Sequence, residues 1–428
     1  MSTRRRALYA FVLGVGLALF GFLQCQGTTV ALCLPFLCYA AALVVSNAIT
    51  RPPRLRVGRA LSSARIPEDE ETEVTLSVTN DGECDAFLSL CDEIPPQTTV
   101  VSGRARVVGR LRAGETWSQS YTLSATRGAH TQRTVSGAIW ARWGLAVRDL
   151  TIRRETRLAS LPTCESLGDI EIRPRRTHAF AGSIRTGRSG SGLEVLGCRE
   201  YALGDDIRRI NWRASARRDD LIVNLFEQER MTDVNLIVDA RAHAHLQIGT
   251  VRSIDLVVRA AASLAAHFLR QSNRVGLLVY GDSLNWTFPG AGRLQMERLL
   301  HALAHARPSA RAAFDRLRHI PTRLFATGSQ LVVLSSLGSA EDAAVPAELV
   351  ARGYSVLLVY PNTLALEGSA LGEGRDAELA LRLVRLRQHA TLTRLARAGV
   401  GVIDWNITEP FAAAIHHARR LTERGRRR

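Results

Sequence analysis

The chain has 428 residues, 46% of them hydrophobic and 22% charged, so it has room for two or three domains with substantial cores. Its formal net charge is +16, and all 56 basic residues are arginine because the sequence contains no lysine. Chemistry that depends on lysine is therefore excluded, including a Walker A phosphate loop, a Schiff base and a kinase-type ATP site. The HExxH, GxSxG and CxxC motifs are also missing.

Two apolar runs come first in the chain. They cover Ala7–Leu23 and Thr29–Ile49, and each is about the ~20 residues that a membrane-spanning helix needs. Arginines flank their outer ends, at Arg4–Arg6 and from Arg51 onward, whereas the connecting loop carries no charge. By the positive-inside rule we predict a transmembrane hairpin over residues 1–56. A cleaved signal peptide and a pair of buried soluble helices are the alternatives.

This hairpin makes the lipid bilayer the first expected partner. The predicted protein spans the inner (cytoplasmic) membrane twice, as a multi-pass protein, with its soluble domains in the cytoplasm. The seven cysteines agree with that compartment, because an odd number with three in or beside the apolar runs does not suggest a disulfide framework.

The next hundred residues, 57–160, alternate between apolar and polar side chains in short runs. Glu73–Thr79 is such a run, and the turn signal Asn80-Asp81-Gly82 follows it. Many short strands with polar turns and no helical stretch predict an all-β Ig-like sandwich. Residues 161–198 are rich in Arg, Gly, Ser and Thr, and we predict a flexible linker there.

A dense set of charges surrounds Trp212 in the stretch Arg199–Arg230. Asp205 or Asp206 is a suitable N-cap for a short helix that follows, and the residues from Leu221 onward alternate as a strand would. We expect Trp212 to be buried against the sheet. A salt-bridged structural cap, a partner-binding surface and a catalytic site are all open interpretations, although no acid, base or nucleophile here has an obvious partner.

Partner binding would use the charged and polar side chains of this motif, with Arg208 or Arg209 reaching outward. The candidate residues are Arg199, Tyr201, Gly204, Asp205, Asp206, Arg208, Arg209, Asn211, Trp212, Arg213, Ser215 and Arg217.

From Val234 onward, continuous apolar runs alternate with amphipathic segments. This alternation predicts an α/β domain of the Rossmann type, in which helices cover both faces of a parallel sheet. Ligands of such sheets bind beyond the carboxyl ends of the strands. The residues expected at that rim are Asp239, Gly281, Asp282, Ser335, Ser336 and Tyr360.

The central motif also resembles a known family. The pattern Arg199-x-Tyr201-x-x-Gly204-Asp205-Asp206-x-Arg208-x-Ile210-Asn211-Trp212-Arg213-x-Ser215-Ala216-Arg217 is similar to the signature of the domain of unknown function 58 (DUF 58) family. Family members often have Asp at position 211 and Lys at position 213. The resemblance implies a von Willebrand factor A-like domain over residues 199–428, behind two membrane helices and a β-sandwich. It also implies a MoxR-type AAA+ ATPase as partner.

The resemblance further implies a position for a divalent metal. Such domains hold the ion with an Asp-x-Ser-x-Ser loop after the first strand, and oxygen ligands suit Mg²⁺ or Ca²⁺. Here the loop begins at Asp239, lacks both serines and carries Arg241 near the place of the ion. We therefore interpret Asp239 and Ser335 as degenerate metal-site positions, and predict no metal and no cofactor. A zinc site of His243, His245 and Asp239 is the alternative.

Together these features predict a membrane-anchored, non-enzymatic scaffold or adaptor that presents its von Willebrand factor A-like domain to a cytoplasmic MoxR-type ATPase. Envelope assembly or complex maturation is the expected process. One alternative is an enzyme with an unrecognised site at the Arg199–Arg230 motif and the sheet rim. Another is a membrane-tethered nucleic-acid binder, which we do not expect because arginine is scattered and no aromatic platform accompanies it. The sequence does not determine an oligomeric state.

Overall fold

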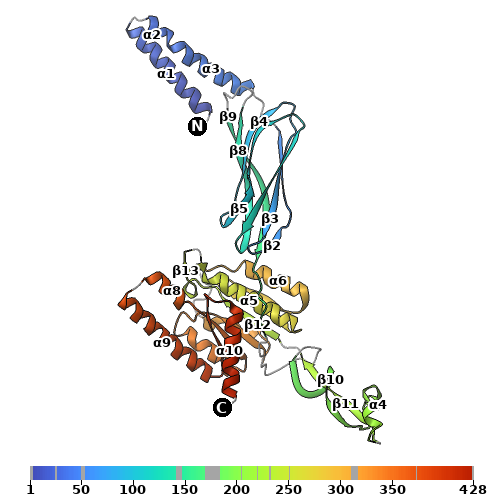
Figure 1. The fold of residues 1–428 in the computed structure, drawn as a ribbon. Coiled ribbons are helices and arrows are strands. Elements are labelled where there is room, and N and C mark those ends of the chain that lie inside the picture. The colour runs from blue at the N-terminus through green and yellow to red at the C-terminus, as the bar shows by residue number, and fades with distance from the viewer. Residues whose placement is uncertain are drawn as a thin grey trace. The chain divides into compact units, whose positions relative to one another are not determined.

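The structure is a computed structural model. It describes residues 3–24, 27–49, 54–140, 147–168, 184–203, 205–218, 220–230, 233–249, 251–309, 317–372 and 374–426. These residues form two compact units, Met1–Ser160 and Leu161–Arg428, and each is described by itself (Figure 1).

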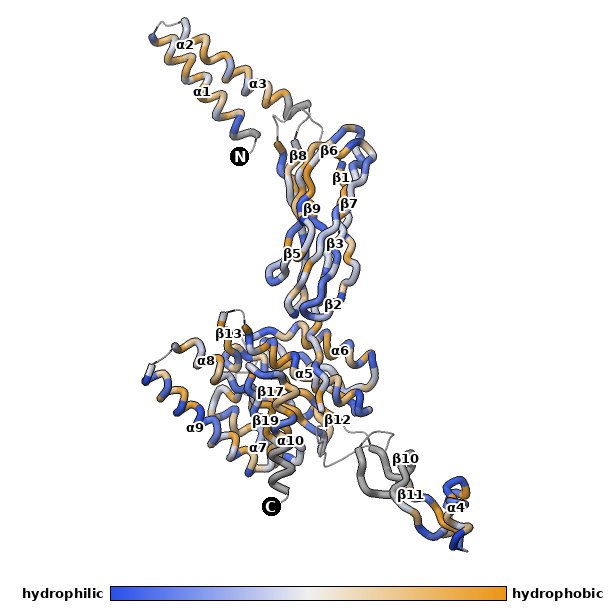
Figure 2. The backbone as a smooth tube through the Cα atoms, in the orientation of Figure 1, coloured by the Kyte–Doolittle hydropathy of each residue, from blue (hydrophilic) through white to orange (hydrophobic). Residues whose placement is uncertain are grey.

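The first unit begins with three helices: α1 (Thr3–Leu23), α2 (Gly27–Ala31) and α3 (Cys33–Ile49). Two stretches, Arg6–Leu23 and Gly27–Val45, are long and apolar enough to cross a membrane, judged by length and composition (Figure 2). A Cβ atom on Gly14 would lie 3.0 Å from the Leu37 side chain, so this glycine lets α1 and α3 approach closely. The second predicted run is divided near Leu32, where Pro35 cannot donate a backbone N–H to continue the helix.

Two antiparallel sheets form the rest of the first unit. One has the order β1-β3-β7-β5 and the other β2-β9-β8-β4-β6. The strand bounds are β1 Leu55–Leu61, β2 Arg65–Pro67, β3 Glu71–Asn80, β4 Ala86–Asp92, β5 Thr98–Gly103, β6 Arg106–Leu111, β7 Thr116–Ala125, β8 Gly128–Trp140 and β9 Val147–Leu161. Alternate residues face inward, so that Leu76 and Val78 of one sheet share a core with Leu88, Leu90 and Val135 of the other. The expected β-rich domain is therefore present.

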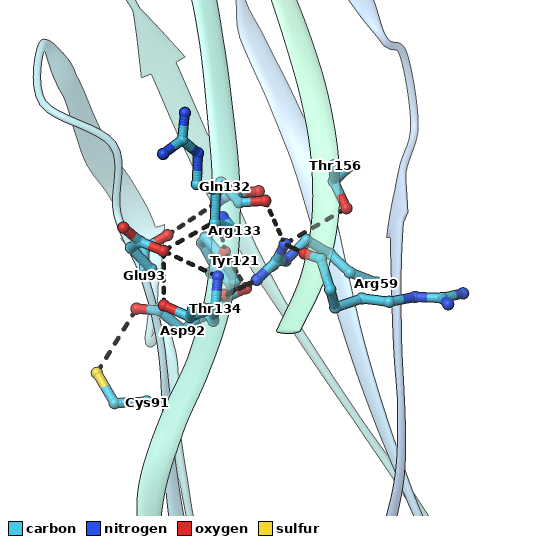
Figure 3. Close-up of polar contacts among 10 residues, drawn as sticks. Arg59, Cys91, Asp92, Glu93, Tyr121, Gln132, Arg133, Thr134 and Thr156 are labelled. Carbon is cyan, nitrogen blue, oxygen red and sulfur yellow. Dashed lines mark hydrogen bonds and ion pairs between the residues drawn. The ribbon is translucent and has the colours of Figure 1, made fainter. Parts of the chain in front are cut away.

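A buried ion pair joins these two sheets (Figure 3). Arg59 of β1 and Asp92 of β4 are paired, and both side chains are fully buried. The Arg59 guanidinium also donates to the carbonyl oxygens of Gln132 (3.2 Å) and Arg154 (2.6 Å). The hydroxyl of Tyr121 in β7 donates to the Asp92 carboxylate at 2.7 Å, and burial together with this hydrogen bond raises the pKa of Tyr121. The charge is thus satisfied internally, as a buried charge requires.

The second unit contains a six-stranded sheet of order β16-β15-β12-β17-β18-β19. Its strands are β12 Asp233–Asp239, β15 Arg274–Tyr280, β16 Leu284–Gly290, β17 Gln330–Leu334, β18 Ser355–Asn362 and β19 Gly401–Asn406. Strand β16 is antiparallel to β15 at one edge, whereas the other five run parallel. All residues of β12 are buried, and Val234, Leu236, Ile237 and Val238 give the strand its apolar character.

Helices cover both faces of this sheet. Leu236 and Val238 of β12 pack in the core that includes α5 (Ser253–Arg270), α6 (Gly292–Ala304) and α10 (Phe411–Arg426). Ile237 between them points to the opposite core, with α7 (Val345–Ala351) and α9 (Arg375–Arg397). Helix α8 (Leu364–Leu371) precedes α9. The alternation of apolar strands with amphipathic helices therefore produces the expected α/β layers.

The predicted linker is ordered at both of its ends. Near its start, Leu167 joins the core of the second unit, and the Glu165 carboxylate accepts a hydrogen bond from the N–H of Ala412 in the first turn of α10 (3.0 Å). Near its end, β10 (Ile184–Glu200) pairs antiparallel with β11 (Ile222–Arg230). The linker prediction is wrong for these parts, because β10 pairs with β11 and the N–H of Glu165 donates to the Ser263 hydroxyl at 2.8 Å. Residues 169–183 lie outside the described residues.

Candidate functional site

The predicted motif lies on the ribbon that β10 and β11 form. We name residues 197–225 the ribbon tip. It contains a 3₁₀ turn, Ile207–Arg209, and the one-turn helix α4, Trp212–Ser215. The expected single helix is split because Ile210, between the two pieces, is extended and pairs with Val223 as a β-bridge.

One carboxylate and one amide side chain cap these short helical turns. The Asp206 carboxylate accepts a hydrogen bond from the N–H of Arg208 at 3.0 Å, and the Asn211 amide oxygen accepts one from the N–H of Ala214 at 3.0 Å. The N-cap prediction for this region is therefore confirmed for Asp206. Asn211 is therefore an uncharged cap.

Asp205 closes a small loop instead of capping a helix. Its carboxylate pairs with the Arg199 guanidinium at 2.6 Å and accepts a hydrogen bond from the N–H of Ala202 at 2.9 Å. The hydrogen bond from Arg199 and the backbone N–H of Ala202 lower the pKa of Asp205 below its usual range. Because the carboxylate is ionised and internally paired, it is poorly suited to act as a general acid or base near neutral pH.

Ser215 and Asn211 tie α4 to β11. The Ser215 hydroxyl donates to the Asn211 carbonyl and accepts from the N–H of Ile222, both at 2.9 Å. The Asn211 amide donates to the Asn224 side chain at 2.9 Å. The N–H of Tyr201 donates to the Leu221 carbonyl at 2.8 Å. These motif residues therefore build the ribbon tip, and they have little capacity left for a partner.

Most of the remaining motif side chains are exposed. Trp212 is 64% exposed, so the prediction that it is buried is wrong. The reason is local: the single turn of α4 buries Ser215, and the bridge buries Ile210, which leaves position 212 on the outer side. The arginine side chains at 208, 213 and 217 are exposed and Arg209 is half-buried, whereas Gly204 lies outside the described residues.

The sheet rim carries the second set of predicted residues. Asp239 ends β12, and Arg241 follows two residues later with a fully buried side chain. The Arg241 Nε and Nη2 atoms donate to the two Asp239 carboxylate oxygens at 2.9 and 2.8 Å. Its Nη1 and Nη2 atoms donate to the Asp342 carboxylate at 3.2 and 3.0 Å. One guanidinium therefore joins two buried carboxylates.

Neighbouring groups complete this cluster. The Ser335 hydroxyl donates to the Asp239 carboxylate at 2.7 Å, and the N–H of Leu317 donates to Asp342 at 3.0 Å. Burial alone would lower the pKa of Arg241, but the two carboxylates outweigh it and raise that pKa. Burial likewise opposes ionisation of Asp342, but the Arg241 and Leu317 hydrogen bonds bring its pKa below the usual value. Arg241 and Asp342 are thus held in their charged forms.

These residues do not fit a metal ion. Both Asp239 oxygens are engaged by Arg241 and Ser335, so the guanidinium supplies the positive charge that an ion would supply. The zinc alternative fits no better, because the His245 ring contacts the Asp239 carbonyl and the Ser253 hydroxyl through its two nitrogens. Among the described residues, no group of three or more His, Cys, Asp or Glu is arranged to hold a metal.

Asp342 is the rim residue that sequence reasoning missed. It lies 101 residues from Arg241 in the chain and begins a short 3₁₀ turn, Asp342–Ala344. No motif spacing marks such a distant partner. The one available signal was the unexplained cation at Arg241, which required a further buried acid.

The fold and these two sites define a multidomain protein with two apolar helical stretches at its N-terminus, a β-rich unit, and an α/β unit in which Arg241 fills the sheet rim. Residues 197–385 match the family model described as "Protein of unknown function DUF58". Uncharacterized proteins of Mycobacterium bovis and Mycobacterium tuberculosis are 29% identical over 116 residues, which are 27% of this chain and 37% of each relative. The match therefore spans well under half of these relatives.

Solved structures resemble short parts of the chain. A FixG-related protein from Vibrio parahaemolyticus matches 26% of this chain and 98% of its own, with 16% identity and a TM-score of 0.18. A PapD-like domain of human CEP192 matches 27% of this chain and 92% of its own, with 19% identity and a TM-score of 0.19. TM-scores this low do not carry an argument about fold or function.

Proposed function

We propose that this chain is a membrane-anchored, non-enzymatic scaffold whose ribbon tip binds a cytoplasmic protein partner. The proposal rests on a difference between two groups of side chains in the motif: some are bonded within the ribbon tip and others are exposed. Asp205, Asn211 and Ser215 are occupied inside the ribbon tip, whereas Trp212 and the neighbouring arginines face solvent. Tryptophan and arginine are the residue types that most often dominate binding energy at protein interfaces.

In this proposal the α/β unit is von Willebrand factor A-like and the β-rich unit is an Ig-like sandwich. Support for the first assignment comes from five parallel strands with one antiparallel edge strand, and from Asp239 at the carboxyl end of the central strand. The ion pairs at the sheet rim support partner binding without a metal, because Arg241 already neutralises the carboxylates of Asp239 and Asp342.

The proposed partner is a MoxR-type AAA+ ATPase, which follows from the family resemblance of the motif. The two apolar N-terminal helices would hold the protein in the inner membrane with both soluble units in the cytoplasm. Envelope assembly or complex maturation is the process in which such a scaffold would act.

Co-purification of the full-length protein from detergent tests this proposal. We expect the ATPase to bind the wild type, and Trp212→Ala or Arg213→Ala to weaken binding about ten-fold or more, as hot-spot truncations do. Phe288→Ala and Arg293→Ala are matched controls, since both residues are exposed in the same unit but outside the ribbon tip. They should bind as the wild type does.

Other outcomes would select other functions. Equal binding by all four variants would remove the ribbon tip as the contact surface. Copurifying nucleic acid that dissociates with salt would favour a nucleic-acid binder. A substrate turned over by the purified protein, and lost in Asp206→Ala, would favour an enzyme.

A further inference from the structure

Helix α9 (Arg375–Arg397) is packed along only part of its length. Near its end, Leu392 and Leu395 are buried in the core beneath the sheet. Closer to its start, Leu381 is half-buried, and a Cβ atom on Gly368 of α8 would lie 3.2 Å from it. The rest of the first four turns is almost entirely exposed, and apolar and polar residues alternate along it (Figure 2).

A leucine stripe runs along the exposed half. Leu379, Leu383 and Leu386 are 51%, 62% and 59% exposed. Their spacings of four and three residues place them on one face of the helix. Leu381 and Leu392 fall on the opposite face, which packs against the protein. The helix therefore has a second apolar side that nothing in the described residues covers.

Arginines surround this stripe. Helix α9 carries six arginines and two acids, which gives a net charge of +4 (six minus two). All six arginine side chains are exposed, and none forms an ion pair with the described residues: Arg375, Arg382, Arg385, Arg387, Arg394 and Arg397. The two acids, Asp376 and Glu378, lie in the first turn, where they stabilise the helix dipole.

This combination limits what can cover the stripe. A second copy of the chain would bring arginines against arginines, which is unfavourable. A specific protein groove would be expected to use aromatic anchors, but the stripe contains only leucine, which is under-represented among interface hot spots. An anionic lipid surface accepts any apolar side chain and attracts each arginine, and amphipathic helices with arginine-rich polar faces bind there.

We propose that the exposed half of α9, residues 379–390, binds the anionic surface of a phospholipid bilayer. The three leucines would enter the boundary between headgroups and acyl chains, while the long arginine side chains reach lipid phosphates. If the chain's own apolar N-terminal helices enter the bilayer, they hold the lipid surface at a high effective concentration near α9. Weak intrinsic binding of α9 to lipid is then sufficient. This inference goes beyond the proposed function, since it concerns another surface and does not need the ATPase.

Hydrogen exchange of the full-length protein in nanodiscs tests the inference. Two nanodisc compositions are compared, phosphatidylcholine alone and phosphatidylcholine with phosphatidylglycerol. We expect amides of residues 379–390 to exchange roughly ten-fold or more slowly in the anionic discs. High salt should weaken this protection, because it screens the arginines.

Two sets of variants separate the apolar and the charged contributions. Glutamine is the replacement throughout, because it preserves helix propensity. The test variants are Leu379→Gln/Leu383→Gln/Leu386→Gln and Arg382→Gln/Arg387→Gln. The matched controls on α6 are Leu294→Gln and Arg293→Gln/Arg298→Gln, whose side chains are also exposed.

Both test variants should lose the lipid-dependent protection, and both controls should keep it. Unchanged exchange in strands β12 and β17 shows that the test variants are folded. Equal exchange of α9 in neutral and anionic discs would overturn the inference. Protection of α9 that arises in detergent and grows with protein concentration would also overturn the inference. It would show that a second copy of the chain covers the leucine stripe. A failed ATPase pull-down would leave the exchange result unaffected, so the two proposals fail separately.

Discussion

Removing the buried guanidinium at the sheet rim should strongly destabilise the α/β unit. Arg241 and Asp239 are fully buried and Asp342 nearly so, and four hydrogen bonds of 2.8–3.2 Å join them. In Arg241→Met the apolar stem is kept, but two buried carboxylates lose their counter-charge. Breaking a buried ion pair from one side costs about 3–5 kcal/mol, which is a large fraction of the stability of an ordinary domain.

The loss should also depend on pH. In the wild type the pKa of Asp342 is lowered from 3.8, so the site contributes stability above that value and loses it only as the pH falls through the folded-state pKa. In Arg241→Met, burial without a cation raises that pKa above 3.8, and folding then takes up a proton. The destabilisation should therefore be largest near pH 8 and smaller near pH 5.

Hydrogen exchange of the amides in β12 and β17 measures this loss in the full-length, detergent-solubilised protein. It reports the opening of the α/β unit separately from the first unit, which a single melting curve does not. Adding Asp342→Asn to Arg241→Met should recover part of the stability, because one unpaired charge is removed. Arg318→Met is the control, since its ion pair with Glu348 is largely exposed and contributes about 0–1 kcal/mol.

Two results would refute this reasoning. A loss below about 1 kcal/mol for Arg241→Met would mean that the carboxylates are not held in a buried, charged state. A loss that is the same at pH 5 and pH 8 would mean that Asp342 does not titrate between these values when the cation is removed.

Three further predictions concern other parts of the chain. Trp212→Ala should change the free energy of unfolding by no more than about 0.5 kcal/mol in exchange measurements, because the side chain is exposed; a loss near 3 kcal/mol would show burial. Asn211→Ala should destabilise the ribbon tip by about 1 kcal/mol through the lost cap, seen as faster exchange at the N–H of Ala214. Arg59→Met should cost the β-rich unit about 3–5 kcal/mol by leaving Asp92 buried and unpaired. Equal losses in Arg59→Met and Arg56→Met, whose ion pair is exposed, would contradict that last expectation.

Long, strongly patterned elements could be predicted from the sequence. The two apolar runs at the N-terminus form helices, and the alternating runs after residue 57 form antiparallel strands. The buried strands of the α/β unit also follow from their sequence, because a strand covered by helices on both faces is mainly apolar, as β12 is at Val234 and from Leu236 to Val238. In each case the signal extends over many residues and needs no knowledge of distant neighbours.

Short elements and single side chains required the tertiary structure. Whether Trp212 is buried depends on which side of one helical turn meets β11, and a four-residue helix has too little periodicity to show it. The same limit hid the β-bridge at Ile210, which divides the predicted helix, and the pairing that makes β10 a strand.

The sheet rim combines both kinds of information. The sequence by itself determined that Asp239 ends a buried strand and that a cation stands two residues later, at Arg241. Only the tertiary structure decided where that cation goes, since Asp342 comes from a turn 101 residues away in the chain. A buried guanidinium needs two acceptors at fixed angles, and those angles are set by how β12 and the segment after β17 pack together.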